Sequence, residues 1–182
     1  MVKKNHSRGR LAEAKKFKPK DWDKESVDKC ILDEIFRISK HQIIFGANHF
    51  ISKMPYDSSS WIVWDKDNGA SDFADCELAW TSHKKAVRIF KHKWQGMLQE
   101  NMKNKEARIH PTQKPLRLFK WCLEKYAPEN AIVFDPFLGS FTTAVACHSH
   151  GLNWIGCEKD EDYFKAGMKR YETECLQGLL QF

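Results

Sequence analysis

The feature that most constrains this chain is the run "AIVFDPFLGSFTT" at positions 131–143. An apolar stretch ends at Asp135, a turn of small residues follows, and Thr142 and Thr143 begin a segment suited to a helix. In open parallel sheets, ligands bind beyond the carboxyl ends of strands, where a following helix offers unpaired N–H groups. The run therefore predicts a strand, a turn and a helix with a ligand site beside Asp135.

Strands and helices alternate through the last third of the chain. The expected elements are strands 131–135 and 153–158 and helices 115–127, 142–149 and 161–176. Alternation of this kind is typical of a parallel sheet with crossover helices. The fold class is therefore predicted to be α/β.

The earlier part of the chain predicts one helix and then strands separated by loops. Residues 26–40 place apolar side chains on one helical face, and Ser26 is a suitable N-cap. The expected strands are a short buried one that leads into a loop within 42–50, and the segments 61–66 and 76–82.

Charge divides the chain into three parts. We interpret residues 1–24 as a charged arm or loop and residues 25–182 as one domain, within which residues 84–109 form a basic segment. The formal net charge is +6 and the sequence pI is about 8.9. A basic balance favours a polyanionic partner, with nucleic acid first.

The cysteines give no metal-binding pattern. They lie at positions 30, 76, 122, 147, 157 and 175, and no two have CxxC spacing, so no metal site is expected. There is no signal-peptide pattern and no apolar run near the length of a membrane span. We therefore expect free thiols, a cytoplasmic location and no membrane partner.

A second acid follows the next predicted strand. Glu158 ends "WIGCE", and an acid at this place commonly accepts hydrogen bonds from ribose hydroxyls. The chain has neither the phosphate-binding GK[ST] pattern nor GxGxxG, and Asp135 would repel a pyrophosphate while suiting a cationic ligand. Spacing alone leaves open an ordinary turn in which Asp135 only caps the helix.

Three ordered motifs resolve this choice by resemblance. "HPTQKP" at 110–115, then "FDPFLGSFTT" and "WIGCEKDEDYF", resemble the DNA amino-methyltransferases, in the motif order of their β class. "WIVWDK", "DFADCELAWTS" and "KAVRIFKHKWQGML" resemble the middle of short phage and prophage members, most of which are adenine-specific. The resemblance implies a Rossmann-like methyltransferase sheet with flanking helices, S-adenosylmethionine as cofactor and double-stranded DNA as partner. It also implies methyl transfer to the exocyclic amine of adenine, with cytosine as second choice.

The resemblance also implies a role for particular positions. In the cofactor site, Glu158 would hold ribose hydroxyls, and Thr112, Gln113 and Lys114 would close over the methionine end. The implied cofactor-binding residues are His110, Thr112, Gln113, Lys114, Pro115, Asp135, Pro136, Phe137, Gly139, Ser140, Thr142, Thr143 and Glu158. The implied DNA-binding residues are Lys84, Lys85, Arg88, Lys91, Lys93 and Trp94. Trp94 has two alternatives, stacking on a base or packing in the fold.

Phe141 departs from the family pattern, which has glycine at this position. A phenylalanine adopts positive φ only at a cost. If the position is helical, the ring is tolerated and packs on the adenine side of the site. If it needs a glycine conformation, cofactor affinity falls. We expect the first alternative.

The second departure concerns catalysis. The family signature is Asp/Asn-Pro-Pro followed by an aromatic, in which polar oxygens accept hydrogens from the target amine and the ring stacks on the flipped base. The printed sequence contains no such motif, so the catalytic residues are unknown and the central strand that carries them is expected to be missing. A truncated reading frame, a split enzyme completed by a second chain or homo-oligomer, and a rearranged front are the three explanations. The alternative functions are a non-catalytic DNA- or cofactor-binding remnant and a methyltransferase acting on RNA or protein. Restriction protection and phage self-marking are both reasonable roles.

Overall fold

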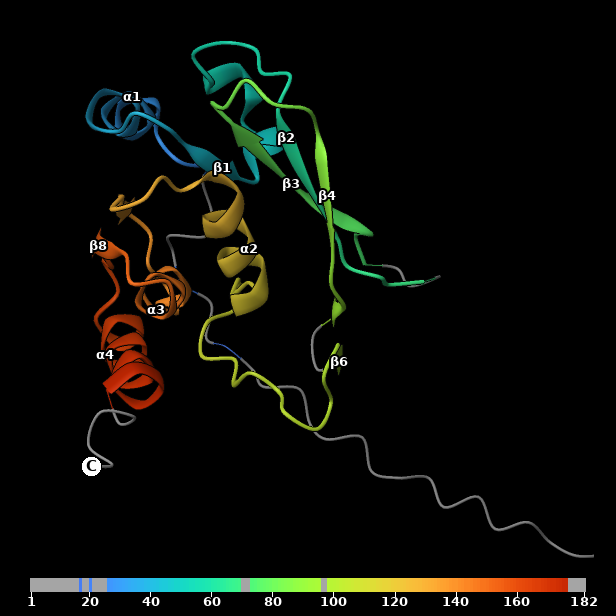
Figure 1. Cartoon of the computed structure of the whole chain (residues 1–182), viewed down its shortest axis with the longest axis vertical. Coiled ribbons are helices and arrows are strands. Elements are labelled where there is room, and N and C mark those ends of the chain that lie inside the picture. Colours follow the sequence, from blue (N-terminus) through green and yellow to red (C-terminus); the bar gives the residue numbers. More distant parts are fainter. Residues whose placement is uncertain (1–16, 18–19, 21–25, 70–72, 96–97, 177–182) are drawn as a thin grey trace, which may run out of the picture.

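The computed structural model describes residues 17, 20, 26–69, 73–95 and 98–176. Helix α1 opens this part of the chain, and strands β1 to β6 follow before helix α2. The last part alternates between strand and helix, as the sequence predicts (Figure 1). The elements are α1 (Lys29–Ile38), β1 (Ile43–Phe45), β2 (Trp61–Asp65), β3 (Cys76–Thr81), β4 (Arg88–Lys91), β5 (Trp94–Gln95), β6 (Leu98–Gln99), α2 (Leu116–Tyr126), β7 (Ile132–Asp135), α3 (Thr142–Ser149), β8 (Asn153–Gly156) and α4 (Glu161–Tyr171), which a π-helical turn (Glu172–Leu176) continues.

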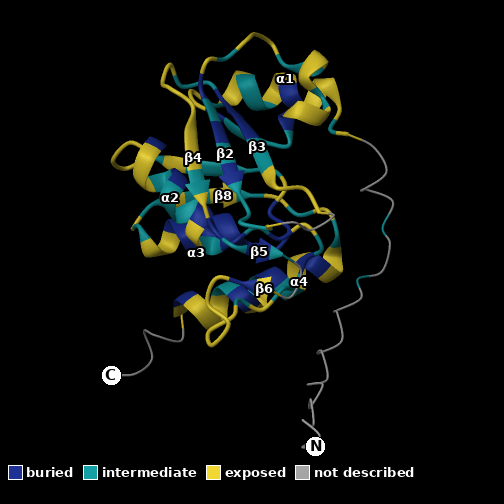
Figure 2. Cartoon of the chain, turned by 90° about the vertical axis from the view of Figure 1, so that its right-hand side faces the viewer, coloured by how far each residue is buried: buried dark blue, intermediate teal, exposed yellow. Residues whose placement is uncertain are grey.

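The largest sheet has four strands in the order β1-β3-β2-β4. Strand β3 is antiparallel to β1 and β2, whereas β4 runs parallel to β2. Alternate residues of β2 are buried because the strand presents one face to helix α2. Ile62 and Trp64 pack there with Leu118 and Cys122. Burying large apolar side chains contributes roughly 1.5–3 kcal/mol each. Figure 2 shows the buried stretches of β2 in dark blue.

The last part of the chain forms a parallel strand pair. Val133 of β7 lies opposite Trp154 of β8, and α3 connects the two strands. Helix α2 lies between the four-stranded sheet and helix α3 (Figure 1). The structure confirms the predicted α/β class and the predicted parallel strand pair. Helix α3 spans the predicted 142–149, and β8 lies within the predicted strand 153–158.

One local prediction in the front of the chain is wrong and another is confirmed. The N-cap of α1 is Asp28, and Ser26 accepts a hydrogen bond from Lys53 Nζ at 2.8 Å instead. The capping error arises where a local signal competes with a longer-range contact. The short strand predicted to lead into a loop within 42–50 ends at Phe45, because Gly46 adopts a left-handed conformation (φ 72°) and short 3-10 turns follow.

The described strands form separate sheets. Strand β1 lies at one edge of its sheet, and β7 pairs only with β8, so each has one unpaired edge among the described residues. No helix in the described part of the chain is long and apolar enough to span a membrane.

The charged arm predicted for residues 1–24 lies almost wholly outside the described residues. Of the two that are described, Lys20 forms ion pairs with Asp160 Oδ2 at 2.7 Å and with Asp162 Oδ2 at 3.1 Å. This part of the arm therefore contacts the start of helix α4.

Candidate functional site

A cavity of about 90 Å³ lies at the carboxyl end of β7. One wall comes from the segment before α2 and the other from the turn between β7 and α3. Its lining is His110, Thr112, Gln113, Lys114, Phe119, Asp135, Phe137, Leu138, Gly139, Ser140, Thr142 and Thr143. The structure thus brings together all predicted cofactor residues except Pro115, Pro136 and Glu158.

Asp135 is the acid of this cavity. Its Oδ1 accepts a hydrogen bond from the Phe137 N–H at 2.9 Å, and its Oδ2 accepts one from the Thr143 hydroxyl. Desolvation raises the pKa of the carboxyl group, while the bonds from Thr143 and Phe137 and the charge of Lys114 act in the opposite direction. The site holds a carboxylate that a nearby cation would stabilise.

Glu158 fixes the turn rather than lining the cavity. Its two oxygens accept hydrogen bonds from the N–H groups of Gly139 and Asp160, each at 2.8 Å. Gly139 has φ 51°, and a Cβ there would lie 3.5 Å from the ring of His110. The turn therefore favours glycine for its left-handed conformation, whereas a Cβ at this distance would only contact the ring.

The wall before α2 is held by its own side chains. Gln113 Oε1 accepts from the Ile109 N–H at 2.9 Å, and its Nε2 donates to the Ala107 carbonyl at 3.1 Å. The Thr112 N–H donates to His110 Nδ1 at 3.3 Å, which makes Nδ1 an acceptor. Lys114 Nζ lies 3.7 Å from a carboxylate oxygen of Glu77.

The predicted residues outside the lining have other places. Pro115 is the N-cap of α2 and is buried. Pro136 faces a separate apolar groove beside α1. Phe119 and Leu138 line the cavity but were missed. Phe119 lies one helical turn after the predicted Pro115, so the helical period is the signal that could have identified it.

Phe141 adopts the glycine conformation. Its φ is 60° and its ψ 24°, so the expectation of a helical position is wrong. The ring is also absent from the cavity lining. It is 1% exposed and packs edge-to-face against Trp154 and Phe164, at centroid distances of 6.1 and 5.7 Å. Burial of the ring against β8 and α4 offsets the backbone cost.

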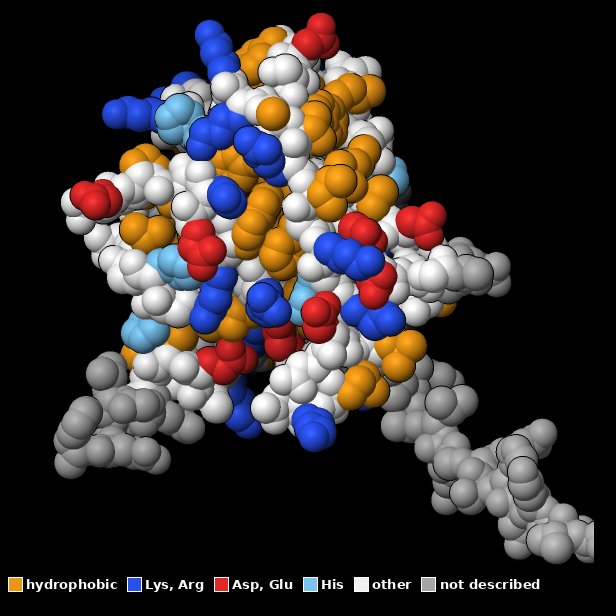
Figure 3. Space-filling view, turned by 45° about the vertical axis from the view of Figure 1, so that its right-hand side comes forward, with side chains coloured by type: hydrophobic (Ala, Val, Ile, Leu, Met, Phe, Trp, Pro, Cys, Tyr) orange, Lys and Arg blue, Asp and Glu red, His pale blue; other side chains and the backbone are white. Residues whose placement is uncertain are grey.

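The cations of the basic segment differ in how much charge they can offer to a partner. Lys84, Lys85 and Arg88 are exposed, and Lys85 Nζ donates to the Lys125 carbonyl at 3.0 Å. Lys91 and Lys93 lie 2.8 and 3.7 Å from Asp67, which reduces the charge that they offer to a polyanion. Figure 3 brings the β4 side of Figure 1 forward and shows Lys and Arg side chains interspersed with carboxylates and hydrophobic side chains.

Trp94 belongs to the core. It is 6% exposed, and its indole N–H donates to the Gln113 carbonyl at 3.1 Å. This supports the packing alternative for Trp94. The contact also joins strand β5 to the cavity wall.

Comparison with known proteins places this fold and cavity in one family. A family model described as DNA methylase, of the N6/N4 type, matches residues 33–169. The putative methylase YubD of Escherichia coli (strain K12) is 44% identical over 63 residues, 35% of this chain and 28% of YubD. The DNA adenine methyltransferase YhdJ of the same organism is 41% identical over 68 residues, 37% of this chain and 23% of YhdJ. The crystal structure of the M1.HpyAVI-SAM complex has 30% identity and a TM-score of 0.51, and the match covers 71% of this chain and 73% of that one.

The structure is an α/β protein with a cavity at the carboxyl end of a parallel strand. Because the family model matches most of the chain, the chain belongs to the DNA methylase family. The matched stretches span less than a third of YubD and of YhdJ.

Proposed function

We propose that this chain acts in an S-adenosylmethionine-dependent DNA methyltransferase that methylates the exocyclic amine of adenine. The observation that carries the proposal is the convergence of segments 110–114 and 135–143 on one cavity in a DNA methylase family member. Lys114 and Asp135 line this cavity, so it offers a cation and an acid together. Such a pair suits the α-amino and carboxylate groups at the methionine end of the cofactor.

The size of the cavity limits what it holds. At about 90 Å³ it is smaller than the roughly 300–1,000 Å³ of a pocket for a whole drug-sized ligand. We therefore assign it the methionine end alone, with Asp135 toward the ammonium and Lys114 toward the carboxylate. When bound, S-adenosylmethionine supplies the sulfonium methyl group that is transferred.

The choice of target rests on relatives. YhdJ is described as a DNA adenine methyltransferase, and the middle motifs resemble adenine-specific phage and prophage proteins. Adenine is accordingly the first candidate and the amine of cytosine the second. A bacterial or phage-infected cytoplasm, where such DNA is found, is the proposed location.

Catalysis needs a segment that the printed sequence lacks, because it has no Asp-Pro-Pro or Asn-Pro-Pro. We propose that a strand from another segment or chain brings this motif and adds to the unpaired edges of β1 and β7. A groove of about 230 Å³ between α1 and β7 supports this, and its lining is almost wholly apolar. The groove residues are Cys30, Ile31, Glu34, Ile35, Ile38, Phe134 and Pro136.

The experiment measures S-adenosylmethionine binding by calorimetry and tritiated methyl transfer to mixed-sequence DNA on one sample. We expect the chain alone to bind the cofactor without transferring the methyl group. Addition of an apolar strand peptide ending in Asp-Pro-Pro-Tyr should then enable transfer. Ile35→Asp, in the groove, should block the effect of the peptide and leave cofactor binding unchanged.

Other outcomes separate the candidate functions. No binding of the cofactor would count against the proposed function itself. Transfer by the chain alone would show that an unrecognised segment replaces the signature. Cofactor binding without transfer, even with the peptide, favours a non-catalytic remnant, which the missing motif already makes the second candidate.

We expect the affinity of the basic segment for DNA to depend mainly on the exposed cations that are not paired with Asp67. We expect Lys84→Gln, Lys85→Gln and Arg88→Gln together to reduce the slope of log affinity against log salt by about one for each phosphate that the variant no longer neutralises. Lys91→Gln with Lys93→Gln should have a smaller effect, because Asp67 already neutralises part of their charge. Fluorescence anisotropy with duplex DNA provides the measurement.

The matched control for the triple variant removes the same charge elsewhere. It combines Lys40→Gln, Lys159→Gln and Lys169→Gln, three exposed lysines outside the segment. An equal change in slope for both triple variants would contradict a DNA-facing role for this segment.

A further inference from the structure

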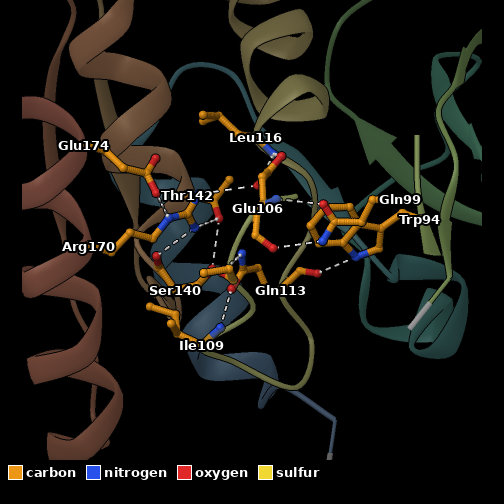
Figure 4. Close-up of polar contacts among 11 residues, drawn as sticks. Trp94, Gln99, Glu106, Ile109, Gln113, Leu116, Ser140, Thr142, Arg170 and Glu174 are labelled. Atoms are coloured by element: carbon orange, nitrogen blue, oxygen red, sulfur yellow. Dashed lines mark hydrogen bonds and ion pairs between the residues drawn. The ribbon is translucent and has the colours of Figure 1, made fainter. Parts of the chain in front are cut away.

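Arg170 of α4 lies behind the cavity and reaches one of its walls. Its side chain is 6% exposed. Nη1 donates to the Ser140 carbonyl at 3.2 Å and to Thr142 Oγ1 at 3.0 Å (Figure 4). Nε donates to Glu174 at 2.8 Å, which fixes the guanidinium from its own helix. Arg170 thus holds the 139–142 turn, which forms the cavity wall that contains Gly139.

The same guanidinium also contacts the segment that carries the other wall. Its Nη2 lies 3.5 Å from Glu106 Oε2. The Glu106 carboxylate accepts from the Leu116 N–H at 3.0 and 3.1 Å, and this N–H begins helix α2, where Pro115 supplies no side-chain cap. One carboxylate therefore joins the start and the end of the 107–115 loop, which carries the cavity residues His110 to Lys114.

Glu106 is itself tightly held. Its backbone N–H donates to Gln99 Oε1 at 2.8 Å, and Gln99 Nε2 donates back to its carbonyl at 2.9 Å (Figure 4). The loop is thus anchored to β6 on one side and to Arg170 on the other. Neither Glu106 nor Arg170 lines the cavity.

We infer that Glu106 and Arg170 are a positioning pair that holds the 107–115 loop against the 139–142 turn and so sets the width of the cofactor cavity. The pair would act on the ligand only through the residues that it holds. The identity of the ligand in this inference rests on the proposed function. The claim that the pair holds the loop against the turn applies to the ligand-free chain as well.

The first test measures the affinity for S-adenosylhomocysteine by calorimetry. Arg170→Met should weaken binding roughly 10- to 100-fold, the range known for residues that orient metal ligands from behind. Ile62→Ala, which empties a core position in β2, is the matched control. It should lower the melting temperature and leave the affinity of the folded protein within about twofold, since it lies in the other core cluster.

A pH profile separates positioning from simple loss of stability. The charged groups around Glu106 are Arg170, Glu174 and Lys120, and desolvation raises its pKa. Without the Arg170 charge the pKa rises further, so the Arg170→Met variant should bind more weakly as pH rises and the unpaired carboxylate ionises. Adding Glu106→Gln, which can still accept from Leu116, should abolish this pH dependence and recover part of the affinity.

Hydrogen exchange tests the inference without any ligand. In Arg170→Met, the amides of the 107–115 loop and the 139–142 turn should exchange faster, while those of β2 and β3 remain protected. Absence of ligand binding by the unaltered chain would contradict the proposed function, and hydrogen exchange would still decide on the pair. Unchanged exchange in both segments, or an affinity within twofold of the unaltered chain, would overturn the positioning role.

Discussion

Replacing Phe141 with glycine is expected to lower the free energy of unfolding by about 2 kcal/mol, although glycine suits this backbone better. The substitution relieves a left-handed conformation that costs roughly 1–2 kcal/mol for a side chain with a Cβ. It also removes a fully buried ring, and emptying such a site costs roughly 3–5 kcal/mol. The loss of packing therefore exceeds the relief of strain, which denaturant unfolding will measure.

The ring of Phe141 occupies the space where Gly167 of α4 lacks a side chain. A Cβ at Gly167 would lie 2.1 Å from Phe141 Cδ2. Gly167→Ala should therefore destabilise the unaltered chain, despite a helix-propensity gain of about 1 kcal/mol. In the Phe141→Gly background the same change should stabilise, because the ring no longer opposes it.

The decisive result is this change of sign in the effect of Gly167→Ala on the free energy of unfolding. A double-mutant cycle measures it directly. Lys169→Ala, at an exposed position of the same helix, is the control and should have equal effects in both backgrounds. If Gly167→Ala destabilises both backgrounds equally, Phe141 is not what requires glycine at position 167.

Asp135→Asn is expected to separate ligand binding from stability. We expect the affinity for S-adenosylmethionine to fall roughly 10- to 100-fold, since a hydrogen bond to a charged group is worth about 1.5–3 kcal/mol. Asparagine retains the shape of the side chain. It can accept from the Phe137 N–H and pair with the Thr143 hydroxyl, as Asp135 does. Calorimetry measures the affinity.

The stability of the ligand-free chain should change in the opposite direction. Desolvation raises the pKa of Asp135, so between its ordinary and its raised pKa the folded chain binds more protons than the unfolded chain. Stability from this group is therefore lost as pH rises through that window. Asp135→Asn removes this pH-dependent destabilisation, and its melting temperature at neutral pH should equal or exceed that of the unaltered chain.

The exposed Asp57→Asn is the control and should alter neither quantity. A lower melting temperature for Asp135→Asn with unchanged affinity would favour the other explanation of this residue, an acid that only caps a turn. The two explanations thus differ in both measurements.

The strand–turn–helix at 131–149 could be predicted because its signals are local. Apolar residues end at Asp135, small residues turn the chain, and α3 starts and ends as expected. The convergence of His110–Lys114 with this turn could not be derived from periodicity and came from the resemblance. Composition alone could not place Trp94, which lies within a basic segment and is nevertheless buried in the core.

Other features depend on contacts that sequence spacing does not reveal. The ring of Phe141 is buried over Gly167 of α4, where no side chain opposes it. Glu106 and Arg170 are 64 positions apart, and neither belongs to a motif. Ser26 makes a contact with Lys53, a residue in a distant turn, in place of its predicted capping role. In each case a tertiary partner overrides the local preference.

The two carboxylates at the turn have a consequence for selectivity within the nucleotide pool of a cell. In phosphate-binding loops, backbone N–H groups of such a turn point at the anion. Here the Phe137 N–H is taken by Asp135 and the Gly139 N–H by Glu158. ATP is an abundant competitor that shares the adenosine of the proposed cofactor, yet its triphosphate would meet occupied donors and the acid Asp135. We therefore expect the turn, in its proposed role, to discriminate by charge against this nucleotide.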